Sequence, residues 1–336
     1  MAHYYLKLKT IESHAAGEPL RVITDGWPEV PGTTILEKRA FARAHHDGIR
    51  KALMWEPRGH ADMYGALMTE PVTPDGDLGV LFLHNEGFST MCGHGVIALT
   101  TVVLEMGFVR REGNPVTLRL DTPAGRVTAR ALLKDGRVQS VAFENVASFA
   151  QELDQRVEVP GIGPVRYDLA YGGAYYAYCD AAELNLGLGP DDQRAAIDAG
   201  MRVKHAITAS RTIVHPAEKD LGYLYGTIIS GPPRSDGANL RNVCIFADGQ
   251  VDRSPTGTGV SGRVAIEHAR GRLKAGQPLV VESILGTRFS GRVVREARVG
   301  GYSAVVPEVE GSAEVLGEAE FWMDLRDPAR GAFLLR

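Results

Sequence analysis

Residues 92–96 read Cys-Gly-His-Gly-Val and residues 256–260 read Thr-Gly-Thr-Gly-Val, and each run opens an apolar segment of helical length. The two runs lie 164 residues apart. Each segment ends at a glycine 15 residues after the loop residue, Gly107 in the first copy and Gly271 in the second. A proline follows 23 or 22 residues after the loop residue, and a strand-like run comes next. Because the register holds across loop, helix and strand, the repeat predicts two homologous lobes.

Turn residues elsewhere in the chain predict a mixed α/β protein that is rich in antiparallel pairing. The 336 residues include 39 Gly and 18 Pro, which separate many short apolar runs. The expected strands are 4–11, 78–84, 116–120, 127–133, 138–143, 166–170, 175–179, 212–214, 243–246, 279–283 and 287–294. The expected helices are 35–45, 95–105, 193–204 and 259–270.

The boundary between the lobes is expected near Gly125, after the first copy of the strand. The tail beyond Gly301 is hard to place in the second lobe, because the matching strand has already been used. We therefore expect residues 1–125 and 302–336 to form the first lobe and residues 126–301 to form the second.

Charge and apolar patterning exclude several classes of partner. There are 37 Lys and Arg against 41 Asp and Glu, a formal charge of −4, and the basic residues are scattered along the chain. Such scattering argues against nucleic acid and anionic membrane as partners. Residues 95–109 form the longest apolar stretch, which is too short for a membrane span. The first ten residues lack a signal-peptide pattern, so we expect a cytoplasmic location.

The three cysteines, Cys92, Cys179 and Cys244, are an odd number and form no CxxC pair. This spacing predicts free thiols rather than a disulfide framework, and no bound metal. Cys179 and Cys244 lie in apolar strand-like runs and are expected to pack in the core. Cys92 lies in the loop at the start of an expected helix, beside Gly93 and His94, where a thiol becomes reactive.

The two repeated loops have the chemistry of an anion site. A helix N-terminus carries partial positive charge and unpaired N–H donors, and glycines let a ligand approach the backbone closely. If the loops face each other across a cleft, they would hold a carboxylate through the backbone N–H groups of Gly93, His94, Gly257 and Thr258. A Cys92 thiolate above the α-carbon could then remove the α-proton of an amino acid. Asp252, four residues before Thr256, is the expected counter-ion for the substrate ammonium.

Simpler structural roles compete with these assignments. Asp252 could cap a turn, and Thr256 could serve only as a helix N-cap. The His94 ring could act as a general acid or could lie against the cleft wall. His60 and Asp62 are expected to form a local structural pair, and a supporting role around the site comes next.

Three stretches resemble segments of the proline racemase family. Residues 85–95 (NEGFSTMCGHG) and 252–259 (DRSPTGTG) are similar to its two signature loops, and residues 56–65 (EPRGHADMYG) resemble a further family segment. The likeness extends over essentially the whole chain. It implies an α/β fold like that of diaminopimelate epimerase, with two pseudo-symmetric lobes. Each lobe would be a barrel-like, mostly antiparallel sheet around a central helix, and the active site would use no cofactor.

The chain departs from the racemase pattern at Thr256. Racemases and 4-hydroxyproline epimerases of this family carry a second Cys in the matching loop, because racemisation needs a base on each face of the α-carbon. A Thr hydroxyl is a far weaker acid than a thiol, whose pKa is about 8.5. Cys92 followed by Thr256 is the pattern of trans-3-hydroxy-L-proline dehydratases. The resemblance therefore implies dehydration of that imino acid to 1-pyrroline-2-carboxylate, with Cys92 as the base.

Other functions stay open at this point. The chain could be a proline racemase or 4-hydroxyproline epimerase, or a degenerate homologue that only binds imino acids. Gly257, Gly259 and Gly262 spell GxGxxG, with Glu282 20 residues further on, as in a dinucleotide fingerprint. Pro255 interrupts the strand that should run into such a loop, which argues against a nicotinamide dehydrogenase. Whether the chain forms a homodimer is also open.

Overall fold

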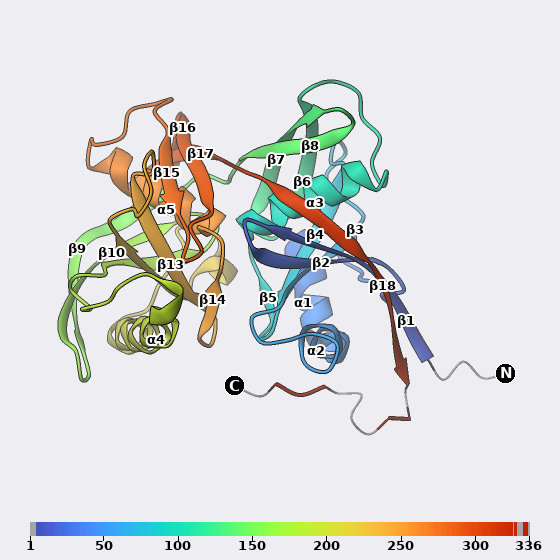
Figure 1. The fold of residues 1–336 in the computed structure, drawn as a ribbon, viewed down its shortest axis with the longest axis horizontal. Coiled ribbons are helices and arrows are strands. Elements are labelled where there is room, and N and C mark those ends of the chain that lie inside the picture. The colour runs from blue at the N-terminus through green and yellow to red at the C-terminus, as the bar shows by residue number, and fades with distance from the viewer. Residues whose placement is uncertain (1–4, 325, 328–331, 335–336) are drawn as a thin grey trace. The chain divides into compact units, whose positions relative to one another are not determined.

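The computed structural model describes residues 5–324, 326–327 and 332–334, and the chain divides into two compact units (Figure 1). The first unit comprises Met1–Val141 and Ser312–Arg336, and the second comprises Ala142–Gly311. Both boundaries lie further along the chain than the expected ones at residues 125 and 302. The reason is strand pairing, because a strand belongs with the partner that satisfies its backbone hydrogen bonds.

The first unit is one sheet with helices on it. Its strands run in the order β18–β1–β2–β3–β4–β6–β7, and only β2–β3 and β4–β6 are parallel. The short β5 pairs with β4. The helices are α1 (Ile35–His45), α2 (Asp47–Met54) and α3 (Gly93–Glu105). The strands are β1 (Tyr5–Ala15), β2 (Glu18–Asp25), β3 (Tyr64–Thr69), β4 (Leu78–His84), β5 (Phe88–Ser89), β6 (Val116–Thr122), β7 (Gly125–Lys134) and β18 (Ala313–Asp324).

The second unit repeats the order of these seven strands and adds β17 at the end. Its order is β9–β10–β11–β12–β13–β15–β16–β17, with parallel pairs at β11–β12 and β13–β15 and with β14 on β13. The helices are α4 (Gln193–Ser210) and α5 (Gly257–Ala269), with short 3-10 turns η1 (Pro190–Asp192) and η2 (Lys219–Leu221). The strands are β9 (Phe149–Val159), β10 (Gly163–Tyr171), β11 (Tyr175–Asp180), β12 (Leu224–Gly231), β13 (Leu240–Phe246), β14 (Gln250–Asp252), β15 (Leu279–Glu282), β16 (Arg288–Val299) and β17 (Tyr302–Gly311).

This correspondence explains the course of the tail. In the second unit β9 covers the edge of β10, and β18 takes the equivalent place beside β1 in the first unit. The chain end therefore returns to the first unit, as expected, but it does so after Gly311 rather than after Gly301. β17 remains in the second unit because it pairs with β16 from Tyr302 to Glu310. β8 (Arg137–Glu144) runs across the other boundary.

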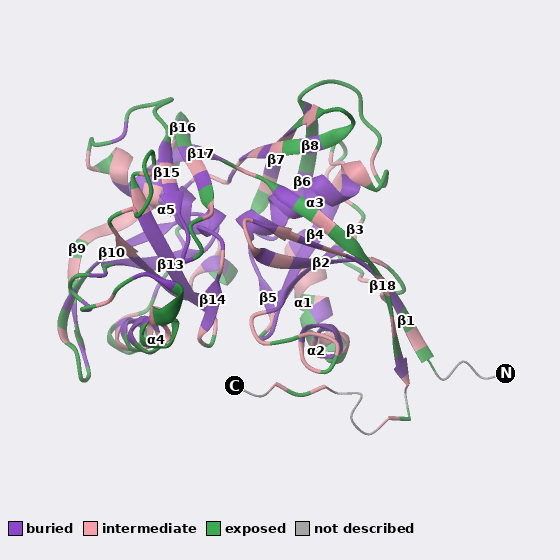
Figure 2. Cartoon of the chain, viewed as in Figure 1, coloured by how far each residue is buried: buried purple, intermediate pink, exposed green. Residues whose placement is uncertain are grey.

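Each unit encloses one apolar helix. Residues 93–103 of α3 are all buried, and the helix packs against β1, β2, β3, β7 and β18 (Figure 2). In the second unit, α5 packs against β9, β10, β16 and β17 in the same way. A helix that is apolar on all sides is stable only inside a core. The expected fold, two pseudo-symmetric lobes with a mostly antiparallel sheet around a central helix, is confirmed.

The predicted helix stops are also confirmed. Gly107 and Gly271 both have left-handed backbone, with φ of 73° and 69°. Their N–H groups donate to the carbonyls of Leu104 and His268 and close the last turns. Glycine is favoured here because other residues are strained at positive φ.

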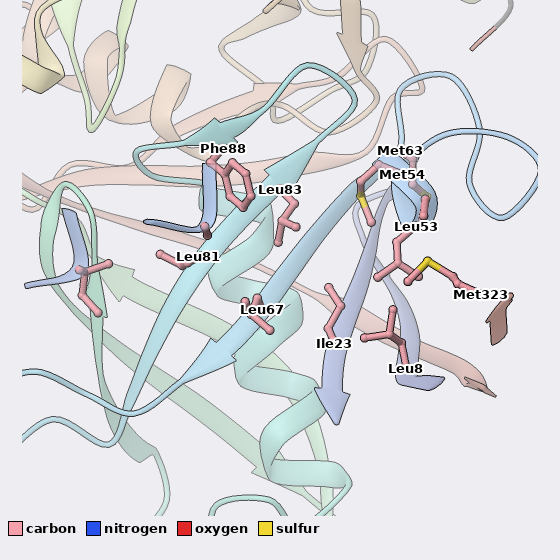
Figure 3. Packing of buried hydrophobic residues seen from close by; sticks show 13 residues of the cluster. Leu8, Ile23, Leu53, Met54, Met63, Leu67, Leu81, Leu83, Phe88 and Met323 are labelled. Atoms are coloured by element: carbon pink, nitrogen blue, oxygen red, sulfur yellow. The ribbon is translucent and has the colours of Figure 1, made fainter. Parts of the chain in front are cut away.

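A second apolar layer lies between the sheet of the first unit and the helices α1 and α2 (Figure 3). Alternate residues of β4 point to opposite faces of the sheet. Leu81 and Leu83 join this outer layer with Leu53 and Met54 of α2, whereas the Phe82 ring lies against α3 at Gly95. β4 is therefore buried on both faces and supports the start of α3.

Two classes of element differ from the expectation. The segment 212–214 forms no strand, because its apolar pattern comes from one buried residue, Ile213, beside an exposed Val214. Several strands lie outside the expected ranges, namely β2, β3, β5, β9, β12, β14, β17 and β18. β18 carries many acidic and small residues, and eleven of its twelve residues pair with β1.

Candidate active site

Cys92 is the N-cap residue of α3 and lies at the end of the loop that follows β5. Its backbone is extended, with φ of −145°, and its sulfur accepts the N–H of Gly95 at 3.2 Å. A Cβ on residue 95 would lie 2.8 Å from the sulfur and 2.8 Å from the Phe82 ring. Glycine at 95 therefore lets the first turn of the helix approach the sulfur. A donated N–H and the helix dipole both favour the thiolate form of such a cysteine.

The His94 imidazole lies beside the same sulfur. The distances from Cys92 Sγ are 3.3 Å to Nδ1 and 3.6 Å to Nε2, so either tautomer could exchange a proton with the thiol. The ring is buried and meets the Tyr64 ring edge to face, with centroids 4.8 Å apart. Tyr64 was missed by sequence reasoning, although it lies within the third family-like segment. Of the first loop's expected residues, Cys92, Gly93 and His94 are thus all buried at the start of α3.

Thr256 begins α5 in a different way. Its backbone has φ of 67° and ψ of 97°, a left-handed conformation that is strained for a β-branched residue. The N–H of Thr256 donates to Ser254 Oγ at 3.1 Å, but its own hydroxyl makes no capping bond. Within the described part of the chain, this buried Oγ1 has no hydrogen-bond partner. The N-cap interpretation is therefore right for the position and wrong for the side chain.

Asp252 ends β14 and is buried. Its Oδ1 accepts the N–H of Ser254 at 2.8 Å, which confirms that it caps the turn before α5. The bond uses one carboxylate oxygen, so the other keeps its capacity to accept a hydrogen bond. A substrate role for Asp252 stays a prediction.

Two tyrosines of β11 hold the first turn of α5, and sequence reasoning found neither. The Tyr176 hydroxyl lies 2.9 Å from Thr258 Oγ1, and the Tyr178 hydroxyl donates to the Gly259 carbonyl at 2.9 Å. Burial raises the pKa of both phenols well above the usual value near 10, so both remain protonated at neutral pH.

Close packing explains the glycines of the GxGxxG run. A Cβ on Gly262 would lie 2.0 Å from the Tyr178 hydroxyl, and a Cβ on Gly259 would lie 2.8 Å from Ile228. Gly257 is buried in the first turn, where its carbonyl accepts the Ser261 hydroxyl. These glycines let α5 pack closely against the sheet. Close packing therefore accounts for the GxGxxG run without a bound nucleotide.

His60 and Asp62 are held by separate contacts. His60 Nδ1 lies 2.7 Å from the Ala61 carbonyl, and the Asp62 N–H donates to Asn85 Oδ1 at 2.6 Å. The Asn85 amide in turn donates to the carbonyls of Met54 and His60. Asn85 therefore anchors this segment to the loop that precedes Cys92, a role that sequence reasoning missed.

Cys179 and Cys244 are buried in β11 and β13, as expected. Burial raises the pKa of the Cys179 thiol far above its usual value, so it is inert at neutral pH. Within the described residues, no three His, Cys, Asp or Glu side chains cluster as metal ligands would. In the same part of the chain, no helix is long and apolar enough to cross a membrane.

The expected site residues belong to two units. Cys92 and His94 lie in the first unit, and Asp252, Thr256 and Thr258 lie in the second. Each unit therefore presents a helix N-terminus with its own distinctive group. The first carries a thiol with a donated N–H, and the second carries a carboxylate and an uncapped hydroxyl. Their joint action on one carboxylate stays a prediction.

Comparison with known proteins gives a consistent result. The family described as proline racemase matches residues 10–334. The chain is 48% identical over 329 residues to a trans-3-hydroxy-L-proline dehydratase of Burkholderia cenocepacia, covering 98% of both chains. It is also 48% identical over 329 residues to a 3-hydroxyproline 2-epimerase of Burkholderia multivorans, again covering 98% of both. A hydroxyproline epimerase structure from Agrobacterium vitis, with bound trans-4-hydroxy-L-proline, superposes with a TM-score of 0.94 at 31% identity, covering 99% of this chain and 96% of that one.

Proposed function

Because the chain belongs to the proline racemase family, we propose that it dehydrates trans-3-hydroxy-L-proline to 1-pyrroline-2-carboxylate without a cofactor. The observation that carries the proposal is the chemical difference between the two helix starts. One presents the Cys92 thiol with a donated N–H, and the other presents the Thr256 hydroxyl where a two-base enzyme needs a second thiol. One base suffices for an elimination, whereas inversion at the α-carbon requires two.

In the proposed reaction, the Cys92 thiolate removes the α-proton of the substrate. The electron pair forms the C2–C3 double bond as the C3–O bond breaks, and the enamine product tautomerises to the cyclic imine. In the trans L-isomer the 3-hydroxyl lies on the same ring face as the α-hydrogen. The newly formed Cys92 thiol can therefore return its proton to the departing hydroxyl, which leaves as water.

The remaining assignments follow from charge. Asp252 would hold the ring ammonium and stabilise the carbanion that develops beside it. The substrate carboxylate would bind the backbone N–H groups at the starts of α3 and α5, including those of Gly93, His94, Gly257 and Thr258. The Thr256 hydroxyl, which satisfies no protein group within the described chain, is available to the substrate.

A second candidate is epimerisation, because one relative is named 3-hydroxyproline 2-epimerase. The deciding experiment incubates the enzyme in D2O with trans-3-hydroxy-L-proline, L-proline and trans-4-hydroxy-L-proline, followed by chiral chromatography and detection of the imine. We expect imine from the first substrate and no inverted product from the others. Inversion without imine would establish the epimerase instead, and binding without turnover would indicate a degenerate homologue.

Cysteine variants test the assigned base. Cys92→Ala should abolish turnover, whereas Cys179→Ala, which removes an inert buried thiol, should retain it. Iodoacetate should inactivate the wild type, and a flat ring carboxylate such as pyrrole-2-carboxylate should slow the inactivation.

The cis 3-hydroxy L-isomer should react far more slowly than the trans isomer, because its leaving group points away from Cys92. Equal rates for both isomers would show that another group protonates the hydroxyl.

The cytoplasmic location stays a prediction, and homodimer formation stays open.

A further inference from the structure

Three aromatic rings and the Cys92 sulfur form a continuous row in the first unit. His84 on β4 stacks on Tyr64 of β3, with ring centroids 5.7 Å apart. Tyr64 meets the His94 ring of α3 at 4.8 Å with an interplanar angle of 77°. The His94 ring then lies 3.3 Å from Cys92 Sγ through Nδ1. The row thus links strands β3 and β4 to the Cys92 thiol.

Tyr64 is fixed at both ends. Its hydroxyl forms a 2.5 Å hydrogen bond with Ser89 Oγ, and both residues are buried. Ser89 lies on β5, which pairs with β4 at Phe82, and Tyr64 lies opposite His84 in the β3–β4 register. A ring held by strand pairing and by a hydroxyl bond cannot turn aside. The His94 imidazole therefore packs on a ring that is held by residues outside its own helix.

We propose that Tyr64 is a positioning residue that holds His94 as the proton partner of Cys92. In the resting site the S–H bond of Cys92 breaks and the proton moves to the adjacent imidazole nitrogen, which leaves a thiolate beside an imidazolium. The Tyr64 ring packs on the imidazole and fixes the ring that receives the proton. The proposal rests on the proposed function only for the role of Cys92 as the base.

Two arginines on the strands that pack against α3 have carboxylate partners of their own. Arg21 on β2 binds Glu12 on β1 at 2.8 Å, and Arg126 on β7 binds Asp121 at 2.8 Å. The buried and half-buried titratable groups on the strands that pack against α3 are Glu12, His14, Glu18, Arg21, Arg126, Arg130 and Asp324, besides Tyr64 itself. The structure places the His94 imidazole at hydrogen-bond distance from the thiol.

Alkylation of Cys92 by iodoacetamide between pH 5 and 10, followed by peptide mapping, tests this role without any substrate. Tyr64→Leu removes the ring that holds His94. The alkylation rate at pH 6 should fall by roughly tenfold, equivalent to a profile displaced upward by about one pH unit, while the rate at pH 10 stays the same. His94→Gln should produce at least the same displacement.

The hydroxyl contact supplies a second, milder test. Tyr64→Phe and Ser89→Ala each break the same hydrogen bond and keep the ring, so each should slow alkylation at pH 6 by about threefold. The double variant should match either single variant, because both remove one interaction. If Tyr64→Leu does not fold, this cycle still decides the question.

Tyr171 supplies the matched control. It is a buried tyrosine of the second unit that contacts His215, and within the described chain its hydroxyl has no partner. Tyr171→Phe should leave the alkylation profile unchanged. An unchanged profile in all the Tyr64 and Ser89 variants, or an equal loss of rate at pH 6 and pH 10, would overturn the proposal. A displaced profile in an enzyme that turns over no hydroxyproline would support the positioning role and refute the proposed function.

Discussion

Gly95→Ala tests how closely the start of α3 must approach the Cys92 sulfur. The added Cβ would lie 2.8 Å from Cys92 Sγ and 2.8 Å from Phe82 Cε1, both well inside the optimal separation of about 3.5–4 Å. The Phe82 ring is fully buried between β4 and α3. The sulfur is the group that can turn, and turning breaks the Gly95 N–H···S bond.

The expected magnitudes separate activity from stability. Overpacking costs about 1–3 kcal/mol, and replacing Gly by Ala within a helix returns about 1 kcal/mol, so the variant should lose at most about 2 kcal/mol. A hydrogen bond to a charged group contributes about 1.5–3 kcal/mol, so loss of the bond to the thiolate should lower kcat/KM by about 10- to 100-fold.

The assay combines thermal unfolding with steady-state turnover of trans-3-hydroxy-L-proline. Gly48→Ala in α2 is the matched control, because nothing lies within 4 Å of its added Cβ. That variant should keep full activity and an equal or higher Tm. If Gly95→Ala kept kcat/KM within about twofold of the wild type, the N–H···S contact would have no role in the thiolate's reactivity.

Three further changes test other parts of the site and fold. Asp252→Asn keeps an oxygen for the Ser254 N–H but loses the charge, so kcat/KM should fall by at least about tenfold with little change in Tm; an unchanged rate would reduce Asp252 to a turn residue. Thr256→Cys places a thiol at the start of α5 and should permit α-deuterium wash-in with inversion of proline or 4-hydroxyproline. Mass spectrometry would measure the wash-in and chiral chromatography the inversion, and a complete lack of wash-in would refute the two-loop site. Burial acts to raise the pKa of Asp121, but hydrogen bonds from Thr73 and Arg126 outweigh it and hold that pKa below its usual value. This stabilisation is present above the unfolded pKa of about 3.9 and is lost as the pH falls through the lower folded value. Asp121→Asn should therefore lower the Tm strongly at pH 7 and much less at pH 2. Equal losses of Tm at both pH values would contradict the assignment.

The repeat explains why much of the fold could be predicted. Local rules determine where α3 and α5 start and end, because Gly107 and Gly271 occupy left-handed positions that favour glycine. The boundaries of the units could not be read in this way. They depend on β17 pairing with β16, its neighbour in the chain, and on β18 pairing with β1 across nearly the whole length of the chain. Pairing between distant segments leaves little trace in either segment alone.

The candidate site divides along the same line. The sequence by itself determined that Cys92 stands at a helix start and that Thr256 takes the equivalent place in the repeat, since both follow from residue type and spacing. Only the tertiary structure decided that Tyr64 packs on His94, and that the Thr256 hydroxyl is left uncapped by a strained backbone. Ring contacts and φ values result from packing between elements that are distant in sequence, and neighbouring residues do not encode them.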